Sequence, residues 1–156
     1  IASTEEPQVF ERSDGALCAN MRSGLNQYRI VSCSENGGES WEAWHYNTDL
    51  PDADTQGSIM RYTTQAMHSK NRVLFSNPGV PYRGSMTVRM SYDEGETWPV
   101  SRLIYEGAAG YSQLAVLSDG TILLLFETGR YDLRESITLA RFDASWLTDG
   151  KDPMTP

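Results

Sequence analysis

Residues 91–98 read SYDEGETW, and residues 34–41 read SENGGESW. The two segments share the pattern S-x-[D/N]-x-G-x-[S/T]-W, with Asn36 at the position of Asp93. In such a turn the Asp or Asn side chain caps backbone N–H groups, and the glycine supplies a positive φ. The Ser or Thr hydroxyl closes local hydrogen bonds, and the tryptophan buries a large apolar surface. The repeat therefore predicts two copies of one unit, each turn joining the third and fourth strands of a small sheet.

Short strand-like segments separated by turns make up the rest of the chain. Each is rich in β-branched, aromatic or aliphatic residues, and helical periodicity is nearly absent. Asp-Gly pairs at residues 14–15 and 119–120 are typical of tight hairpin turns. The segments expected as strands are residues 8–11, 16–21, 28–33, 58–64, 72–75, 86–90, 102–105, 112–117, 121–126 and 137–142. We therefore predict an all-β chain with local antiparallel pairing.

A four-stranded sheet cannot bury both of its faces alone, so repeated sheets must stack, as the blades of a β-propeller do. We predict about three four-stranded antiparallel blades, over about residues 6–50, 56–106 and 109–145. The third of these lacks a convincing fourth strand. Because a propeller typically has four to eight blades, the sequence predicts a partial propeller, completed by another part of the protein or by a partner chain.

Charge and hydropathy exclude several classes of function. The formal net charge is -8, whereas a nucleic-acid-binding protein usually carries a basic surface. No apolar run approaches the roughly 20 residues of a membrane helix. We therefore expect neither a nucleic-acid partner nor a membrane segment, and an anionic ligand would have to be attracted by a local arginine cluster.

The two cysteines, Cys18 and Cys33, fall on strands expected to be neighbours in a hairpin. A disulfide is compatible with this placement, but two buried free thiols are the favoured interpretation. No Cys and His residues have zinc-site spacing, and His45 and His68 are isolated. We expect no metal site and no cofactor.

Candidate functional residues gather around one glycine-rich segment. Residues 107–110 read GAAG, and Tyr111 follows them at the start of a predicted strand. Such small residues leave space in front of a tyrosine ring. Arg83 precedes the strand expected at residues 86–90, and residues 54–58 are a further candidate for lining the same site.

The turn at residues 91–98 resembles the Asp box of the sialidase (neuraminidase) family, six-bladed β-propellers that remove terminal sialic acids. An Asp box occurs in many propellers, so other motifs carry the resemblance. They are EPQV at residues 6–9, SDG at 13–15, NMR at 20–22, Arg83 ahead of MTVR at 86–89, GYSQL at 110–114 and FE at 126–127. They follow one another as in the C-terminal half of the family's domain, and the resemblance covers essentially the whole chain.

The resemblance implies a role for each of five residues. These are Tyr111 as the nucleophile, Glu6 as its acidic partner, Arg22 and Arg83 as two of three carboxylate-binding arginines, and Glu127 as the supporting acid that braces the first arginine. We expect them to converge at one end of the strands. The first arginine and the general acid of the family have no match in this chain.

Two of these assignments have rivals in the sequence. Glu5 competes with Glu6, which is favoured because it directly precedes Pro-Gln-Val. Arg89 competes with Arg83, but Arg89 lies inside a predicted strand. Glu6 and Arg83 therefore remain the preferred candidates.

The chemistry of sialic acid explains these residue types. Its anomeric carbon carries a carboxylate, which arginine forks bind bidentately. That carboxylate would repel an anionic nucleophile. Most glycosidases use a pair of carboxylates, and the tyrosine nucleophile of the sialidase family is an exception to this scheme. A phenol with an ordinary pKa near 10 needs an adjacent base and nearby positive charge at neutral pH.

The resemblance implies a retaining exo-α-sialidase that releases terminal sialic acid from sialylated glycans. That substrate class favours an extracellular or periplasmic location. Two alternatives remain: a non-catalytic sialic-acid-binding propeller, and a purely structural Asp-box propeller. We also predict that Trp41 and Trp98 are buried and remote from the arginine cluster.

Overall fold

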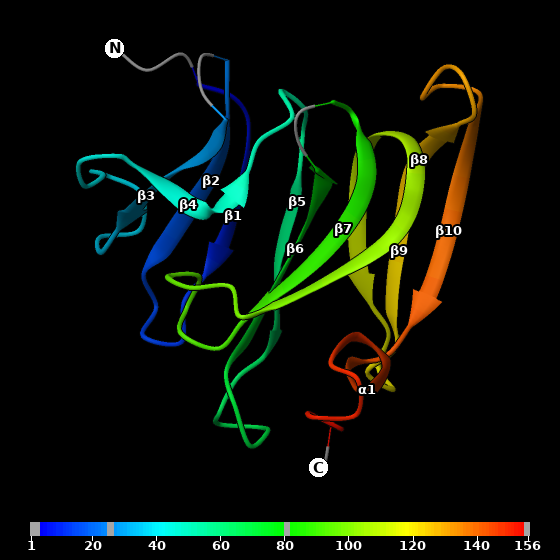
Figure 1. The fold of residues 1–156 in the computed structure, drawn as a ribbon. Helices are drawn as coiled ribbons and strands as arrows, with labels where there is room; N and C mark the ends of the chain where they lie inside the picture. Colours follow the sequence, from blue (N-terminus) through cyan, green and yellow to red (C-terminus); the bar gives the residue numbers. More distant parts are fainter. Residues whose placement is uncertain (1–3, 25–26, 80–81, 155–156) are drawn as a thin grey trace.

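The structure, a computed structural model, describes residues 4–24, 27–79 and 82–154. Figure 1 shows strands arranged side by side with a short helix near the C-terminus. The described residues form ten strands and one helix: β1 (Thr4–Glu11), β2 (Leu17–Ser23), β3 (Tyr28–Ser34), β4 (His45–Pro51), β5 (Ser58–Thr63), β6 (Arg72–Gly79), β7 (Gly84–Ser91), β8 (Val100–Val116), β9 (Ile122–Gly129), β10 (Ser136–Phe142) and α1 (Ala144–Leu147). The all-β prediction is confirmed.

The first sheet is an antiparallel meander in the order β1-β2-β3-β4. Cys18 and Cys33 are directly opposed in the register of β2 and β3, as expected of hairpin neighbours. The prediction of two free thiols is nevertheless wrong, because the two residues form a disulfide. Opposed residues of an antiparallel pair have adjacent side chains, which places both sulfur atoms within bonding reach.

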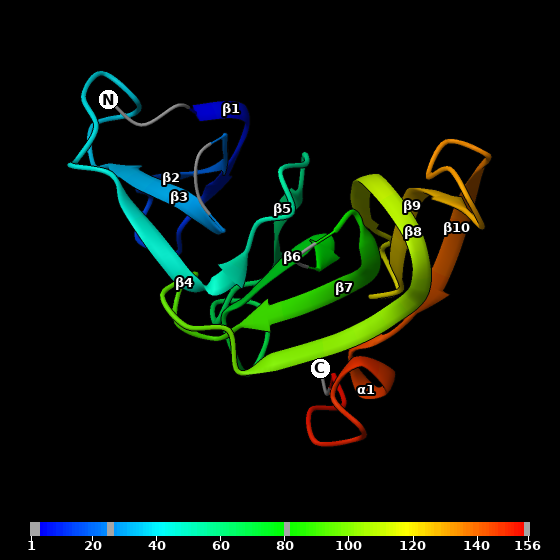
Figure 2. The ribbon, with the colours of Figure 1, turned by 45° about the horizontal axis from the view of Figure 1, so that its top comes forward.

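The second sheet has six strands in the order β10-β9-β8-β7-β6-β5. Strand β8 joins the two segments expected at residues 102–105 and 112–117 into one strand of 17 residues. Its first part pairs with β7 and its second part with β9, and Ala108 is opposite both Gly84 and Gly129. Figure 2 shows the strong curvature of β8 that brings its two parts against different neighbours. Strand β4 was not among the expected segments.

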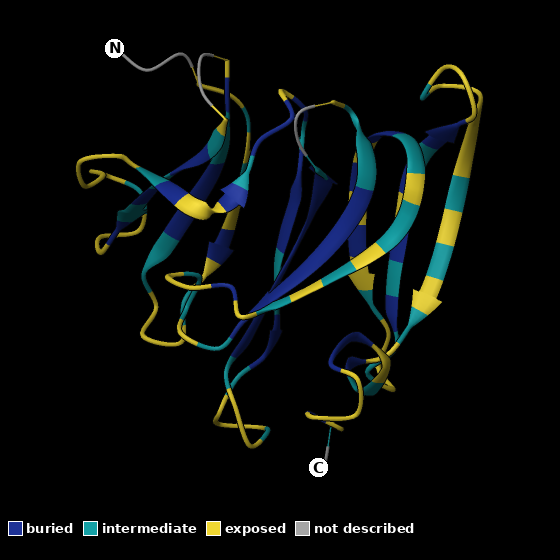
Figure 3. Ribbon diagram, in the orientation of Figure 1, coloured by how far each residue is buried: buried dark blue, intermediate teal, exposed yellow. Residues whose placement is uncertain are grey.

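Two groups of buried side chains form the core. One lies within the curved six-stranded sheet and includes Met86, Val88 and Leu124. The other lies between the two sheets and includes Phe10 from β1 and Phe75 from β6. Figure 3 shows nearly continuous burial along β6 and β7 and alternating exposure along the edge strand β10. This alternation is typical of a strand with one face towards the solvent.

The two repeated turns have the predicted internal hydrogen bonds. Asp93 Oδ1 accepts from the Ser91 hydroxyl at 2.8 Å and from the Thr97 backbone N–H at 2.9 Å. Asn36 Oδ1 makes the corresponding bonds to Ser34 and Ser40, both at 2.9 Å. The glycines at the shared position, Gly38 and Gly95, have φ values of 94° and 91°. Asn replaces Asp without loss of the turn because the capping oxygen is common to both.

The two tryptophans of the repeat have different environments. Trp98 is 6% exposed and packs against Phe75, with ring centroids 5.8 Å apart. Trp41 is 43% exposed, so the prediction that it is buried is wrong. Trp98 lies between the two sheets, whereas Trp41 lies on the outer face of the first sheet, beside the exposed Trp44 and Val9. Burial of this tryptophan depends on a neighbouring sheet, and no other described segment covers the outer face of the first sheet.

Within residues 4–24, 27–79 and 82–154, no helical segment combines the length and hydropathy that crossing a membrane requires. The same part of the chain contains no group of three or more His, Cys, Asp or Glu side chains arranged to hold a metal ion.

Candidate active site

Strands β1 and β2 place Glu6 beside Arg22. Arg22 is the next-to-last residue of β2 and is opposite Glu5 in the register. The register shifts between Glu5 and Gln8, and Pro7 lies inside this irregularity. Proline has no N–H to donate to the ladder, so it is accommodated at such a bulge. The bulge turns the Glu6 side chain towards the strand-end site.

Glu6 links Tyr111 to Arg22. The Tyr111 hydroxyl donates a hydrogen bond to Glu6 Oε1, and Arg22 Nη1 donates to Glu6 Oε2 at 3.0 Å. Glu5 lies 3.4 Å from Arg22 and has a side chain that is 51% exposed. Of the two rival acids, Glu6 is therefore the one in contact with the tyrosine.

Asp54 joins the two arginines. Arg22 donates through Nε and Nη2 to Asp54 Oδ1, at 2.9 and 2.8 Å. Arg83 donates through Nε to the backbone oxygen of Asp54 at 3.1 Å, and also through Nη2. The Arg83 guanidinium carbon lies 6.0 Å from the centre of the Tyr111 ring. The sequence indicated residues 54–58 only as a lining segment, and the turn's pairing with both arginines was not predicted.

Glu127 positions the backbone of the tyrosine. Its Oε2 accepts a hydrogen bond from the Tyr111 N–H at 2.9 Å. The pairing of β8 and β9 shifts register between Ala109 and Ser112, so Tyr111 lies at an irregularity of the ladder. Such irregularities re-aim side chains. A side chain at Gly110 would place its Cβ 2.1 Å from Glu127 Oε2, so only glycine fits there without displacing the carboxylate.

The rival arginine, Arg89, lies elsewhere. It is 7% exposed, within β7, and donates to Asn77 Oδ1 at 2.7 Å. Burial lowers the pKa of Arg89 to about 10. The structure thus brings together Glu6, Arg22, Arg83, Tyr111 and Glu127, and leaves Arg89 outside the cluster.

Charges around the tyrosine fix where its proton lies. The hydrogen bond from Tyr111 to Glu6, together with partial burial, raises the pKa of the phenol. Burial opposes ionisation of Glu6, but hydrogen bonds from Tyr111 and Arg22 lower its pKa overall. Burial likewise opposes the charge of Arg22, yet Glu6 and Asp54 raise its pKa. At neutral pH the phenol is protonated and the adjacent carboxylate is ionised.

Three of the five described non-glycine residues with positive φ lie at or next to this site. Glu6, Asp54 and Ser85 have φ values of 45°, 56° and 55°. Few non-glycine residues adopt this left-handed region, and such residues gather at functional sites, where surrounding contacts hold them. All three lie in segments that carry or contact the arginines.

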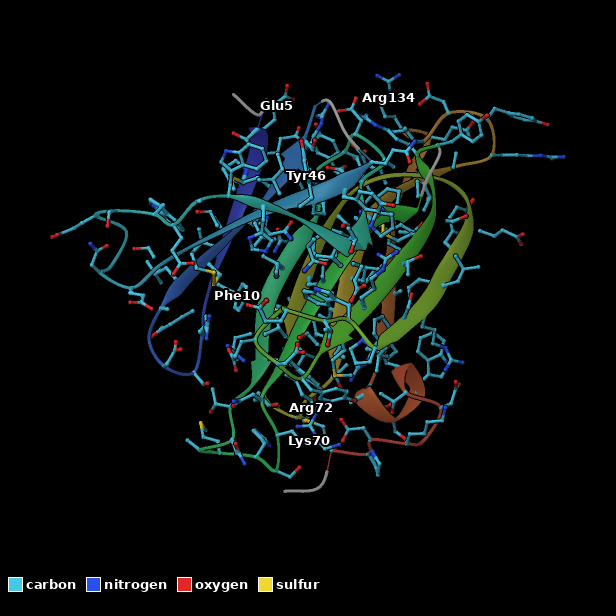
Figure 4. The ribbon with its side chains drawn as sticks, turned by 60° about the vertical axis from the view of Figure 1, so that its left-hand side comes forward. Glu5, Phe10, Tyr46, Lys70, Arg72 and Arg134 are labelled. Atoms are coloured by element: carbon cyan, nitrogen blue, oxygen red, sulfur yellow. A yellow bond between two sulfur atoms is a disulfide. The ribbon has the colours of Figure 1, made fainter. Side chains whose placement is uncertain are left out.

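The site is assembled from both sheets. Glu6 and Arg22 belong to the first sheet, and Tyr111 and Glu127 belong to the second. In Figure 4, Glu5 lies at the same end of the molecule as Arg134, and Arg72 lies at the opposite end. The cluster is therefore at one end of the strands, remote from the Arg72 end.

Residues 1–124 match the family model described as a BNR repeat-like domain. The chain belongs to the BNR repeat-like domain family. The match includes both copies of the S-x-[D/N]-x-G-x-[S/T]-W turn at residues 34–41 and 91–98.

Relatives of this BNR repeat-like chain include proteins named as sialidases. It is 38% identical over 148 residues to a sialidase of Micromonospora viridifaciens, an alignment that covers 92% of this chain and 22% of the relative. It is 31% identical over 163 residues to an exo-alpha-sialidase of Aspergillus fumigatus, covering 93% of this chain and 38% of the relative. The BNR repeat-like chain thus spans well under half the length of these two relatives.

The fold of the BNR repeat-like chain is also found in sialidases. It superposes on the solved structure of the Hadza microbial sialidase Hz136 with a TM-score of 0.80 and 31% sequence identity. The superposition covers 92% of this chain and 28% of the sialidase. The predicted membership of the sialidase family and the sialidase-type propeller fold are confirmed.

Proposed function

We propose that this chain is part of a retaining exo-α-sialidase, which releases terminal sialic acid from sialylated glycans. The observation that carries the proposal is the hydrogen bond from the Tyr111 phenol to the ionised Glu6, next to two arginines. An activated nucleophile is usually hydrogen-bonded to a base, and a third group orients that base. Here Tyr111, Glu6 and Arg22 have this arrangement. The relatives named sialidase and exo-alpha-sialidase support the same conclusion.

Arg22 and Arg83 are proposed to bind the carboxylate of sialic acid. Both guanidinium groups lie near the tyrosine, and both are held by Asp54, so their forks are oriented before a ligand arrives. Paired N–H donors on a fixed plane match the two oxygens of a carboxylate. Binding the carboxylate in this way places the anomeric carbon, to which it is attached, in front of Tyr111.

The chemical steps follow from the placement of the proton. The Tyr111 oxygen bonds to the anomeric carbon while the bond to the aglycone oxygen breaks, and the phenol proton passes to Glu6. A general acid from another part of the propeller protonates the leaving oxygen. Water then attacks the anomeric carbon and gives a proton to the conjugate base of that acid. The bond to Tyr111 breaks, and Glu6 returns the proton to the phenol. Two inversions retain the configuration.

The resemblance to the family provides two of its three arginines and no match for its general acid in this sequence. General acid catalysis typically contributes about 10²- to 10⁴-fold to rate. We therefore expect little hydrolase activity from residues 1–156 alone and full activity from the complete propeller. Assay of both with a fluorogenic α-sialoside checks this expectation, and full turnover by the isolated segment would contradict it.

The decisive experiment replaces Tyr111 by phenylalanine in the complete protein. A 3-fluorosialyl fluoride should trap a covalent adduct on wild-type Tyr111, identified by peptide mass spectrometry, and the variant should form none. Sialic acid binding should persist, because the arginines are unchanged. Tyr46→Phe, on β4, is the control and should label normally. An adduct on another residue, or full turnover by the Tyr111 variant, would refute the mechanism. Binding without adduct or turnover in the wild type would instead favour the non-catalytic sialic-acid-binding propeller.

A further inference from the structure

A buried carboxylate lies directly beneath the arginine pair. Asp52 follows β4 and is 4% exposed. Its Oδ2 accepts from the Ser23 backbone N–H at 2.7 Å, and its Oδ1 accepts from the backbone N–H groups of Asp54 and Thr55 at 3.0 and 3.4 Å. Ser23 directly follows Arg22 in β2. One side chain therefore anchors the backbone next to Arg22 and the backbone of its partner Asp54.

The arginine below Asp52 closes the network. Arg29, on β3, is fully buried and lies 3.4 Å from Asp52 Oδ2. It donates to the backbone oxygen of Thr55 at 2.8 Å and to Asn20 Oδ1 at 2.8 Å. Burial lowers the pKa of Arg29 to about 10, although Asp52 acts to raise it. The turn at residues 52–55 is thus held from below through both its side chain and its backbone.

This network does not have the features of a device for stability alone. A buried ion pair often stabilises a fold no better than apolar residues of the same shape. Its hydrogen bonds instead converge on backbone groups: Asp52 accepts from the N–H groups of Ser23, Asp54 and Thr55, and Arg29 donates to the Thr55 oxygen. A network of this kind is better explained by the geometry that it imposes on the groups above it.

We propose that Asp52 is a positioning residue, which sets the relative placement of Arg22 and Asp54 and, through Asp54, that of Arg83. Asp52 has no contact with the site surface of its own, because its side chain is fully buried. Its effect on a ligand passes through the backbone of Ser23 and through Asp54, which has a φ of 56° and contacts both guanidinium groups. The inference rests on the proposed function of the arginines as carboxylate ligands.

If Asp52 positions the arginines, its loss should reduce the selectivity of the site for a carboxylate. If Asp52 only supports the fold, its loss should leave that selectivity unchanged. Two correctly placed arginine forks favour a sialic acid over its uncharged methyl ester. Substituting a residue that orients a metal ligand typically lowers metal affinity or activity about 10- to 100-fold. Asp52 would orient carboxylate ligands in the same indirect way, so we expect an effect of similar size on the preference for the acid. Loss of positioning should reduce the preference for the acid, whereas general destabilisation should affect both ligands equally.

The experiment measures Kd for N-acetylneuraminic acid and for its methyl ester with the complete protein. Asp52→Asn should lower the ratio of the two affinities at least about tenfold. Asp152→Asn is the matched control. Asp152 is also a buried aspartate bonded to a buried arginine, Arg72, but Figure 4 shows Arg72 at the end of the molecule opposite Glu5. The control should lower the melting temperature and leave the affinity ratio within twofold of the wild type.

A second variant keeps the test decisive if Asp52→Asn does not fold. The Asp54 side chain is 62% exposed, so Asp54→Asn should fold normally and should also lower the ratio. If both variants fold, their effects on the ratio should be less than additive, because Asp52 acts through Asp54. An unchanged ratio in either variant would overturn the inference. A wild-type protein with no preference for the acid would instead refute the proposed function of the arginines.

Discussion

Replacing Gly110 by alanine should disable the site while preserving the fold. The new Cβ would lie 2.1 Å from Glu127 Oε2 and 2.8 Å from Leu133 Cδ1. Both atoms are at the ends of flexible side chains, so they can move, and Gly110 does not have a positive φ that alanine would resist. A carbon and an oxygen need about 3.2 Å, so the carboxylate must retreat by about 1 Å and lose its hydrogen bond to the Tyr111 N–H.

The magnitude follows from that hydrogen bond. Bonds to charged groups contribute about 1.5–3 kcal/mol, so the free energy of unfolding should fall by about 2 kcal/mol. A misplacement of about 1 Å at a reacting group can lower rate about 100-fold, and we expect a loss of that order in kcat/KM on a sialoside. Urea unfolding and steady-state kinetics of the complete protein measure the two effects separately.

The control for Gly110 is Gly79→Ala. Its Cβ would make an ordinary contact of 3.5 Å with Ser85, so activity and stability should change little. In a Glu127→Ala background, the Gly110 substitution should have a much smaller effect on kcat/KM, because the displaced carboxylate is already absent. Wild-type kinetics for Gly110→Ala, or the same loss with and without Glu127, would refute the reasoning.

Three further predictions concern stability. Trp98→Ala should lower the free energy of unfolding by about 3–5 kcal/mol, as for other buried aromatic truncations. Trp41→Ala should lower it much less, because the Trp41 ring is 43% exposed. Equal losses of stability in urea unfolding would contradict this. The double substitution Cys18→Ala with Cys33→Ala removes the disulfide and should lower the free energy of unfolding by about 3 kcal/mol, given the sequence separation of 15. An unchanged urea midpoint would show that the disulfide does not stabilise the fold by restricting the unfolded chain. Hydrogen bonds from Arg72 lower the pKa of Asp152 from 3.8 to about 2. The ionised carboxylate should therefore add about 2 kcal/mol to the free energy of unfolding above about pH 4, and this contribution should be lost as the pH falls towards 2. If the stability difference between the wild type and Asp152→Asn did not shrink in acid, the prediction would be wrong.

Local chemistry explains what was predictable from the sequence. The turn at residues 91–98 depends on bonds among its own side chains and backbone, so its pattern predicts its structure wherever it occurs. The order of the motifs around Glu6, Arg22 and Tyr111 predicted residues that the structure brings together across about a hundred positions of sequence. Their proposed roles rest on the family resemblance and not on spacing alone.

The wrong or missing predictions concern properties that a local sequence pattern does not encode. Opposed positions for Cys18 and Cys33 follow from hairpin pairing, but their oxidation state does not follow from residue pattern. Burial of Trp41 requires a neighbouring sheet, which the turn itself does not specify. The contacts of Asp52 and Asp54 join a loop to strands on either side of it, and neither partner is visible in a local motif.

The position of the site at the meeting of two sheets has a thermodynamic consequence. Each sheet has its own hydrogen-bonded ladder, and packed side chains and scattered hydrogen bonds hold one sheet against the other. A sialoside held by Arg22 on one side and Arg83 on the other would act as a reversible cross-link between two cooperative units. Ligand at 100 times its Kd contributes about 2.7 kcal/mol to the state that binds it, and here that state is the docked pair of sheets. Occupancy of the site would therefore slow hydrogen exchange of the backbone amides along the whole contact between β1 and β5, far beyond the residues that touch the sugar.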